Sequence, residues 1–369
     1  MGRTVVLVAV VGLLAGAVPA RNATSTRRVL ELARLQSRSF GIAAIYDVAA
    51  CGPYCRSYTP RIYATRDAHS WLEVTPPHLL PEVEDVFFRT PSVAWVAAND
   101  CAAARAFVYR TRDGGRTWRR ARVPATNCPG GSRLDVSFAD ARHGWILLVA
   151  ENGNRVGLFR TRDGGKTWTD VGEDAPLKGS IAFASPRIGW LARSDFPLPG
   201  QLYATRDGGR SWHRRKLRLP RGWQRARAFP DRPTFFGARG VLPVDFVLGR
   251  RTAVAFYTTA DNGRTWRPRA VLRVDSSVLT GPSEGGAIRY IPTSIATPSA
   301  WWIAVGRKRG AVAETSDGGH SWHVASAPVV GSEISAGGAR RAWLTTSRGR
   351  SGVYATSDRG RSWHRLELP

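Results

Sequence analysis

Thr161–Trp168 (TRDGGKTW) and its six near copies decide the fold of this 369-residue chain. Five copies keep the pattern Thr-x-Asp-x-Gly-x-Ser/Thr-Trp and lie at Thr111–Trp118, Thr205–Trp212, Thr259–Trp266, Thr315–Trp322 and Thr356–Trp363. The seventh, TRDAHSW at Thr65–Trp71, is one residue shorter. Their aspartates follow one another at steps of 41 to 56 residues: Asp67, Asp113, Asp163, Asp207, Asp261, Asp317 and Asp358. This period is typical of a four-stranded propeller blade, so the sequence predicts an all-β, seven-bladed β-propeller of antiparallel blades.

The residues around each motif read as four short strands. In the third repeat these are Leu134–Phe138, His143–Ala150, Gly157–Thr161 and Thr167–Val171. The motif itself indicates a turn, because its Asp can accept backbone N–H bonds and its glycines allow positive φ. The first glycine position changes to Asn262 and Arg359, so we expect the second to be the obligatory left-handed one. His69 occupies that place in the first repeat, which predicts a rebuilt turn there.

Tryptophan placement follows the same period. Seven of the fourteen tryptophans close the motifs, and we expect each to pack against the strands of its own blade. Six more fall in second strands, at Trp95, Trp145, Trp190, Trp301, Trp302 and Trp343. Only Trp223 has no place in the repeat.

The motif resembles the Asp-box (BNR) repeat of sialidases, sortilin-type receptors and the photosystem II stability/assembly factors. The Gly-Trp pairs of the second strands and the seven units look most like the assembly factors and their non-catalytic, sialidase-like bacterial relatives. The resemblance covers roughly residues 40–369. It implies that the motif aspartates are structural and lie on the face opposite the ligand mouth. That mouth would be built by the loops between second and third strands and by the crossovers between blades.

Candidate binding residues on that mouth are mostly basic or aromatic: Arg155, Asp195, Arg221, Trp223, Arg225, Glu284, Arg307 and Arg309. Trp223 lies among arginines and could stack on a sugar ring or a peptide side chain. The alternative is a loop tryptophan folded back onto its blade.

An enzymatic alternative is a glycoside hydrolase of sialidase type. Sialidases use an arginine triad, a Tyr nucleophile helped by Glu and an Asp acid/base, and most carry Arg-Ile-Pro near the start. The nearest match here, Arg289-Tyr290-Ile291-Pro292, has an extra Tyr and lies in the sixth repeat. A two-carboxylate glycosidase would need facing acids. Candidates are Glu82, Glu84 and Asp85, with Asp85 able to point into the central channel, and Asp47, Asp195, Asp245 and Glu284. No pair stands out, and we expect no catalysis.

The first 20 residues read as a secretory signal: one Arg, an apolar run and small residues ending at Ala20. Retention as a membrane anchor is the alternative. We assign residues 21–28 to a linker and 29–369 to the propeller, with Val29–Phe40 supplying the first strand of blade 1. Four cysteines in an exported chain favour disulfides, Cys51 with Cys55 and Cys101 with Cys128. The spacing is a weak match to a metal site, so we predict no metal and no cofactor.

The formal net charge is +26, nearly all of it from arginine. The charge indicates binding to anionic partners, or a surface composition without function. No nucleic-acid-binding motif is present. The sequence therefore predicts a secreted or envelope-bound, monomeric propeller that binds a protein or an acidic glycan or other anionic envelope polymer, without a membrane span once the signal is removed.

Overall fold

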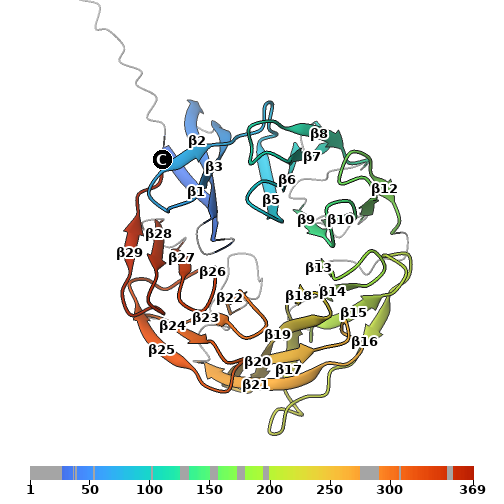
Figure 1. The fold of residues 1–369 in the computed structure, drawn as a ribbon, viewed down its shortest axis with the longest axis vertical. Coiled ribbons are helices and arrows are strands. Elements are labelled where there is room, and N and C mark those ends of the chain that lie inside the picture. The colour runs from blue at the N-terminus through green and yellow to red at the C-terminus, as the bar shows by residue number, and fades with distance from the viewer. Residues whose placement is uncertain are drawn as a thin grey trace, which may run out of the picture.

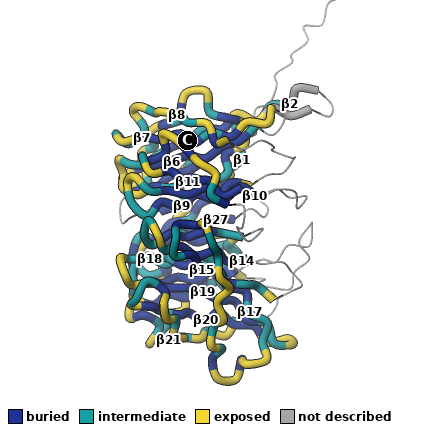
Figure 2. The backbone as a smooth tube through the Cα atoms, turned by 90° about the vertical axis from the view of Figure 1, so that its right-hand side faces the viewer, coloured by how far each residue is buried: buried dark blue, intermediate teal, exposed yellow. Residues whose placement is uncertain are grey.

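The computed structural model shows a closed ring of seven blades (Figure 1). It describes residues 27–35, 37, 40–52, 55–100, 103–124, 133–149, 157–172, 179–193, 199–274, 291–306, 309–346 and 352–369. Seen edge-on, the ring is a flat disc with its buried residues in the middle layer and exposed residues toward the loops (Figure 2). The prediction of a seven-bladed all-β propeller is confirmed.

Each blade takes its strands from one continuous stretch of chain, counted outward from the channel. Blades 1 to 4 contain β1 (Arg27–Leu35), β2 (Gly41–Gly52), β3 (Cys55–Thr65) and β4 (Trp71–Glu73); β5 (Glu82–Phe88), β6 (Ala94–Asp100), β7 (Arg105–Thr111) and β8 (Arg119–Arg122); β9 (Arg133–Phe138), β10 (Gly144–Val149), β11 (Gly157–Thr161) and β12 (Thr169–Asp170); β13 (Ser180–Phe183), β14 (Gly189–Arg193), β15 (Gln201–Thr205) and β16 (His213–Arg215). Blades 5 to 7 contain β17 (Arg227–Pro230), β18 (Thr234–Phe236), β19 (Arg239–Leu248), β20 (Arg251–Thr259) and β21 (Arg267–Val274); β22 (Thr293–Ile295), β23 (Trp301–Val305), β24 (Gly310–Thr315) and β25 (His323–Ala327); β26 (Glu333–Ala336), β27 (Ala342–Thr346), β28 (Gly352–Thr356) and β29 (His364–Leu366).

The ring closes without exchange of a strand between its ends. β1 pairs with β2 in blade 1, as expected from the sequence, and blade 7 is complete in β26–β29. The seam between blades 7 and 1 is held by Ser335, whose Oγ accepts from the Leu35 N–H and donates to the Leu35 carbonyl, both at 2.9 Å. Closure therefore depends on side-chain packing and hydrogen bonds alone.

The core lies between the blades. Buried residues form seven apolar clusters, and each cluster takes its side chains from two neighbouring blades. Trp145 of blade 3 stacks on Phe183 of blade 4 with ring centroids 3.6 Å apart, and Trp212 meets the same Phe183 edge-on. Other motif tryptophans also meet the preceding blade: Trp266 of blade 5 packs edge-on against Trp190 of blade 4, and Trp322 of blade 6 packs against Phe256 of blade 5, which extends the prediction. A single blade could not bury these faces, so the ring folds as a unit.

The motif turns repeat one hydrogen-bond pattern. In the turn of blade 4, Asp207 Oδ1 accepts from the Ser211 N–H and the Thr205 hydroxyl, and Oδ2 accepts from the Ser211 hydroxyl. The Gly208 N–H then donates to the carbonyl of Arg187, in the loop between the first two strands of the same blade. The motif turns and these inner loops therefore lie together on one face of the disc, here called the motif-turn face.

Both glycine positions of the motif turns are left-handed. The second glycine position has positive φ, as predicted. The first position also has positive φ, even where it is occupied by Asn262 (57°) or Arg359 (70°). The expectation that only the second position needs this conformation was wrong, because non-glycine residues can adopt positive φ at an energetic cost. The second position has a further constraint: a Cβ on Gly263 would lie 2.3 Å from the Trp190 ring of the preceding blade. In the shortened blade 1 turn Ala68 alone is left-handed, so this turn is rebuilt.

Candidate functional site

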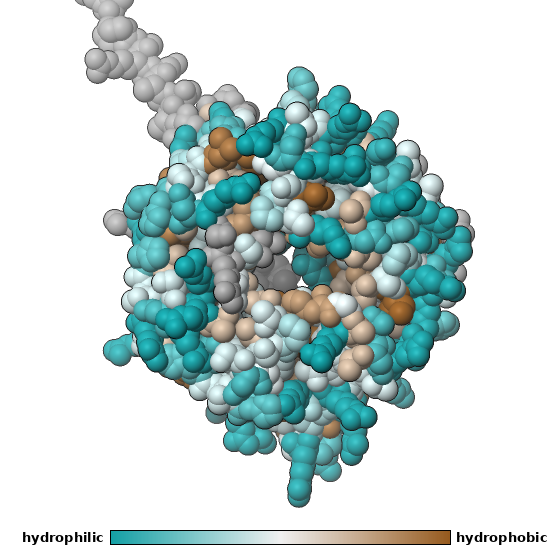
Figure 3. Space-filling view, in the orientation of Figure 1, coloured by the Kyte–Doolittle hydropathy of each residue, from teal (hydrophilic) through white to brown (hydrophobic). Residues whose placement is uncertain are grey.

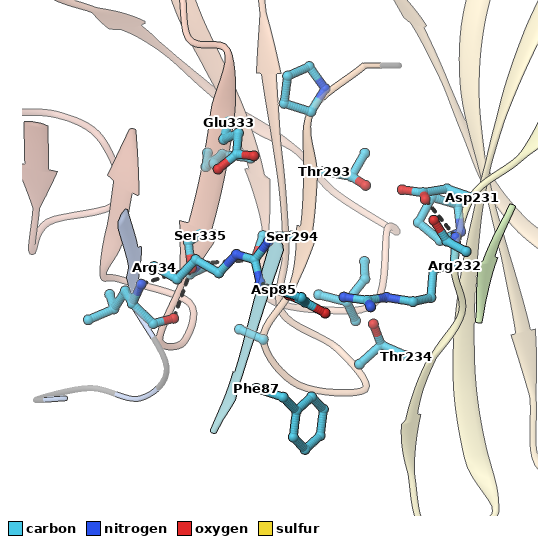
Figure 4. Close-up of a pocket in the computed structure, with 18 of the residues that line it drawn as sticks. Arg34, Asp85, Phe87, Asp231, Arg232, Thr234, Thr293, Ser294, Glu333 and Ser335 are labelled. Atoms are coloured by element: carbon cyan, nitrogen blue, oxygen red, sulfur yellow. Dashed lines mark hydrogen bonds and ion pairs between the residues drawn. The ribbon is translucent and has the colours of Figure 1, made fainter. Parts of the chain in front are cut away.

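The innermost strand of every blade faces the ring axis (Figure 1). A central cavity of about 1390 Å³ lies there and is lined by all seven of these strands. Its lining includes Arg34 of β1, Asp85 of β5, Arg232 of blade 5 and Glu333 of β26 (Figure 4), together with Glu84 of β5 and Asp135 of β9. Inner strands place alternate side chains into this space, because successive residues of a strand point to opposite sides. The channel is the one place where all seven blades meet.

Asp85 and Asp135 tie neighbouring blades together at the channel wall. Asp85 accepts from Arg34 Nη1 at 2.9 Å and from the Val136 N–H of the next blade at 3.0 Å. Asp135 repeats this one blade further on, accepting from the Ile181 N–H at 2.5 Å. Both side chains are buried. Burial opposes ionisation of Asp85, but Arg34 and Arg232 outweigh it and hold its pKa below the usual value.

Arg232 reaches these aspartates from the far side of the channel. The inner strand of blade 5 is interrupted between β17 and β18 by Asp231, Arg232 and Pro233, of which only Asp231 keeps a backbone bond to β19, from its N–H to the Pro243 carbonyl. Proline cannot donate to a ladder, so Pro233 favours the break. The Arg232 side chain then extends into the cavity toward Asp85 (Figure 4). Its Nη1 donates to Asp135 Oδ1 of blade 3 at 3.1 Å.

The carboxyl groups around the channel differ from those of the motif turns. Burial, then repulsion by Glu82, raises the pKa of Glu84 to about 7. Burial and the neighbouring Glu333 raise the pKa of Glu31. Burial also raises the pKa of Asp135 despite the nearby Arg232. In the motif turn of blade 2, by contrast, bonds from Thr117 lower the pKa of Asp113 to about 2.

The end of the channel at the motif-turn face is apolar. Phe87, Phe236 and Ile295 line it and are each half-buried. Figure 3, which draws this face, shows light brown surface around the central opening and hydrophilic surface farther out. The cavity is therefore amphipathic, with charged groups in its interior and apolar side chains at one mouth.

The structure describes four of the eight predicted binding residues, and three of these, Arg221, Trp223 and Arg225, lie in one loop before β17. Arg221, Arg225 and Arg309 are exposed. Trp223 is only 3% exposed, with its ring 5.9 Å from that of Phe246 and the Arg251 guanidinium 4.9 Å above it. Stacking of Trp223 on a ligand is wrong for this structure; the alternative of a tryptophan folded back onto its blade describes it. The chain after Trp223 forms strands β17 and β18 of blade 5, whereas the sequence suggested that it is part of the crossover between blades 4 and 5. Arg155, Asp195, Glu284 and Arg307 lie outside the described residues.

Several other predictions fall wholly or partly outside the described residues. These include the signal at 1–20, and Cys101 and Cys128. Cys51 and Cys55 stand at the facing ends of β2 and β3, and only their backbone is described. Within the described ranges, no helix has the length and apolar character to cross a membrane. Within the same ranges, no three His, Cys, Asp or Glu side chains gather as a metal site would need.

Of the residues that make up the channel, sequence reasoning placed only Asp85 correctly. Arg34 and Asp135 sit in ordinary inner strands and carry no motif. Arg232 gave one usable signal: two prolines, Pro230 and Pro233, close together in a segment that should contain an inner strand. Two other acids that the sequence suggested are engaged: Asp47 pairs with Arg28 and Arg61, and buried Asp245 accepts from the Ile291 N–H.

Comparison with known proteins agrees with this fold. Residues 129–266 match the family described as "Photosynthesis system II assembly factor YCF48". The chain is similar to this family across blades 3 to 5. YCF48 from Cyanidioschyzon merolae is 17% identical in a match covering 79% of this chain and 86% of that one, with a TM-score of 0.49. The β-propeller domain of the Trilobed protease from Pyrococcus furiosus is 9% identical over 94% of this chain and 97% of that one, with a TM-score of 0.54. No curated protein matches the chain significantly.

Proposed function

We propose that this chain is an extracytoplasmic, non-catalytic β-propeller that binds another protein and assists its assembly. The observation that carries the proposal is the use of Asp85 and Asp135 as structural bridges. Both acids accept backbone N–H bonds from the next blade and pair with an arginine, so neither is free to act on a substrate. The match of residues 129–266 to an assembly-factor family supports a protein partner.

The surface supports an acidic partner. The chain carries a formal charge of +26, and Arg221, Arg225 and Arg309 are exposed on the crossover side of the ring. Such a surface attracts anionic partners over a distance set by the ionic strength. The predicted signal and the predicted cysteine pairs support an encounter outside the cytoplasm. An acidic glycan would bind through the same charges, and cross-linking would then give adducts that contain glycan and no protein.

Glycoside hydrolysis is the second candidate, because of Glu84. A half-buried carboxyl with a pKa of about 7 is what a general acid needs at neutral pH. The charges of Glu31 and Glu84 contribute to raising the pKa of Tyr46, so a Tyr and a Glu lie near each other here, as the nucleophile and its helper do in sialidases. However, burial raises the pKa of Tyr46 to about 12, and its hydroxyl accepts from the Val83 N–H at 2.7 Å. A nucleophile activated by a lowered pKa would show the opposite direction.

Photo-cross-linking in cells that make the protein tests the proposed function. A cross-linking residue placed at Arg221 or Arg309 should give a discrete protein adduct. The matched control is Val324, which is 61% exposed on an outermost strand and should give none. Deletion of the chain should then lower the amount of the cross-linked protein. Adducts containing only glycan, or an unchanged partner level, would contradict an assembly role.

A fluorogenic glycoside panel, sialosides included, tests the second candidate with the purified mature protein. We expect no turnover. Turnover that disappears in Glu84→Gln, while Glu82→Gln keeps it, would establish an enzyme and overturn the non-catalytic proposal.

A further inference from the structure

Three alternate positions of blade 5 differ in chemistry along the channel. Arg232, Thr234 and Phe236 all line the cavity, as do their neighbours Asp231 and Phe235. They present a cation, a hydroxyl and an aromatic ring in that order, toward the motif-turn face. This gradient follows from the break between β17 and β18, which no other described blade has in its inner strand.

This part of the cavity keeps unused hydrogen-bond donors. A guanidinium has five N–H groups. That of Arg232 gives one bond, to Asp135, and its other N–H groups meet no acceptor among the described residues. The Thr234 hydroxyl likewise has no bond to a described residue. Of the neighbouring carboxylates, Asp85 takes three bonds, from Arg34, Val86 and Val136, whereas Asp231, which also lines the cavity, takes one, from the Arg232 backbone N–H.

Beyond these donors the wall is apolar. Phe87 of β5, Phe236 of β18 and Ile295 of β22 are half-buried there. In the close-up, Phe87 points into the cavity across from Thr234 (Figure 4). A sugar acid would have to bury several hydroxyls against this wall without partners, which is costly. A hydrocarbon chain or aromatic ring would be stabilised by it.

The two mouths of the channel differ in their side chains. At the end away from the motif turns, Glu84 of β5 and Glu333 of β26 line the cavity together with Arg133 of β9, so charges of both signs meet there. The motif-turn mouth has apolar side chains, with exposed Arg89 beside them.

We propose that the channel binds an amphipathic monocarboxylate, with its carboxylate on Arg232 and Thr234 and its apolar tail against Phe87, Phe236 and Ile295. The cavity of about 1390 Å³ exceeds the range of about 300 to 1000 Å³ usual for small-molecule sites, so the tail has room. This site does not depend on the protein partner proposed above, and either can fail without the other.

Calorimetric titration of the purified protein with a ladder of straight-chain acids tests the site. Butyrate, hexanoate and octanoate should bind with increasing affinity, by two- to fourfold per methylene, because a buried methylene contributes about 0.8 kcal/mol. Octanoate should bind at least tenfold more tightly than octanamide, which has the same tail without the charge. The preference should persist at about 0.5 M salt, where attraction to the general positive surface is screened. Equal binding of acid and amide, or no dependence on chain length, would refute the proposal.

Variants separate this site from the basic surface. Arg232→Gln should abolish the preference for acid over amide, whereas Arg214→Gln, the same change on the exposed outer strand β16, should leave it intact. Thr234→Val should weaken octanoate binding about three- to tenfold, as loss of one hydrogen bond predicts. Because Arg232→Gln leaves Asp135 unpaired and could impair folding, Arg232→Gln/Asp135→Asn provides a second variant without the unpaired charge. Acid preference that survives in the folded double variant would overturn the assignment.

Discussion

The aspartates of the motif turns and Glu84 at the central channel respond to folding in opposite ways. In the motif turns each Asp accepts several short bonds at the protein edge, and Asp358 has its pKa lowered to about 2 by the Ser362 hydroxyl and N–H. At the channel, burial and the like charge of Glu82 raise the pKa of Glu84 to about 7. The motif-turn aspartates therefore stabilise the fold when charged, whereas Glu84 destabilises it when charged. Asp85 in the channel wall follows the motif turns, because Arg34 and Arg232 hold its pKa below the usual value.

The difference separates scaffold from site. The motif turns repeat because each blade meets the next in the same way, so one solution serves everywhere. The channel wall repeats one feature, the bridge from Asp85 and from Asp135 to a backbone N–H of the next blade, but its arginines follow no such period: Arg34 pairs with Asp85, and Arg232 reaches Asp135 from blade 5. Perturbed pKa values cluster at functional sites, and structural ion-pair networks produce them as well.

The largest effect should come from the repeated scaffold. Trp145→Ala removes a fully buried ring that stacks on Phe183 and whose Nε1 donates to the Gly208 carbonyl at 2.9 Å. We expect the free energy of unfolding to fall by about 3 to 5 kcal/mol, as for other buried aromatic truncations. Denaturant titration followed by tryptophan fluorescence measures it. Leu72→Ala, at an apolar residue that is 62% exposed, is the control and should change stability by less than about 0.5 kcal/mol. Similar losses in both variants would mean that the blades do not depend on their interfaces.

The pH dependence of stability should have opposite slopes in the two regions. Folding raises the pKa of Glu84, so a charged Glu84 lowers the free energy of unfolding. This destabilisation is absent below about pH 4, grows between about pH 4 and 7, and is constant above pH 7. Glu84→Gln should therefore raise the free energy of unfolding by roughly 1 to 3 kcal/mol near pH 8 and leave it unchanged near pH 4. Thermal unfolding across this range measures the difference between variant and parent.

Asp207 supplies the matched comparison. Burial opposes its ionisation, but bonds from Ser211 and Thr205 outweigh it and lower the pKa to about 2. Its stabilisation is therefore present above about pH 4 and is lost as the pH falls toward 2. Asp207→Asn should destabilise at neutral pH by about 1 to 3 kcal/mol. Glu84→Gln and Asp207→Asn changing stability in the same direction at neutral pH would contradict the division into two regions.

The sequence predicted what is periodic and missed what is not. The spacing of the aspartates was enough for the number of blades, the place of β1 and the role of the motif turns, because these are local features repeated seven times. The spacing could not predict the channel site, because Arg232 and Asp135 are 97 residues apart in the sequence and meet only once the ring has closed. Trp223 misled for the same reason. An aromatic residue outside the repeat looks functional, yet its environment is set by Phe246 and Arg251, which come from other strands.

The smallest effect concerns the seam, where the repeated scaffold has to close on itself. Ser335→Ala removes both bonds to Leu35 and leaves its N–H and carbonyl without their partner, so we expect a loss of about 1 to 2 kcal/mol. Ser294→Ala is the control within the ring: it removes the bond from the Ala336 N–H at the junction of blades 6 and 7, where the chain runs on between the blades. Because no strand crosses the seam, loss of the Ser335 bonds should let β1 separate locally from blade 7. Amide hydrogen exchange in β1 should therefore accelerate in Ser335→Ala. This acceleration should be far larger than the one that Ser294→Ala causes in β26. Equal acceleration in the two variants would show that the seam is no weaker than the other six junctions, and that packing of Trp343 against blade 1 is enough to close the ring.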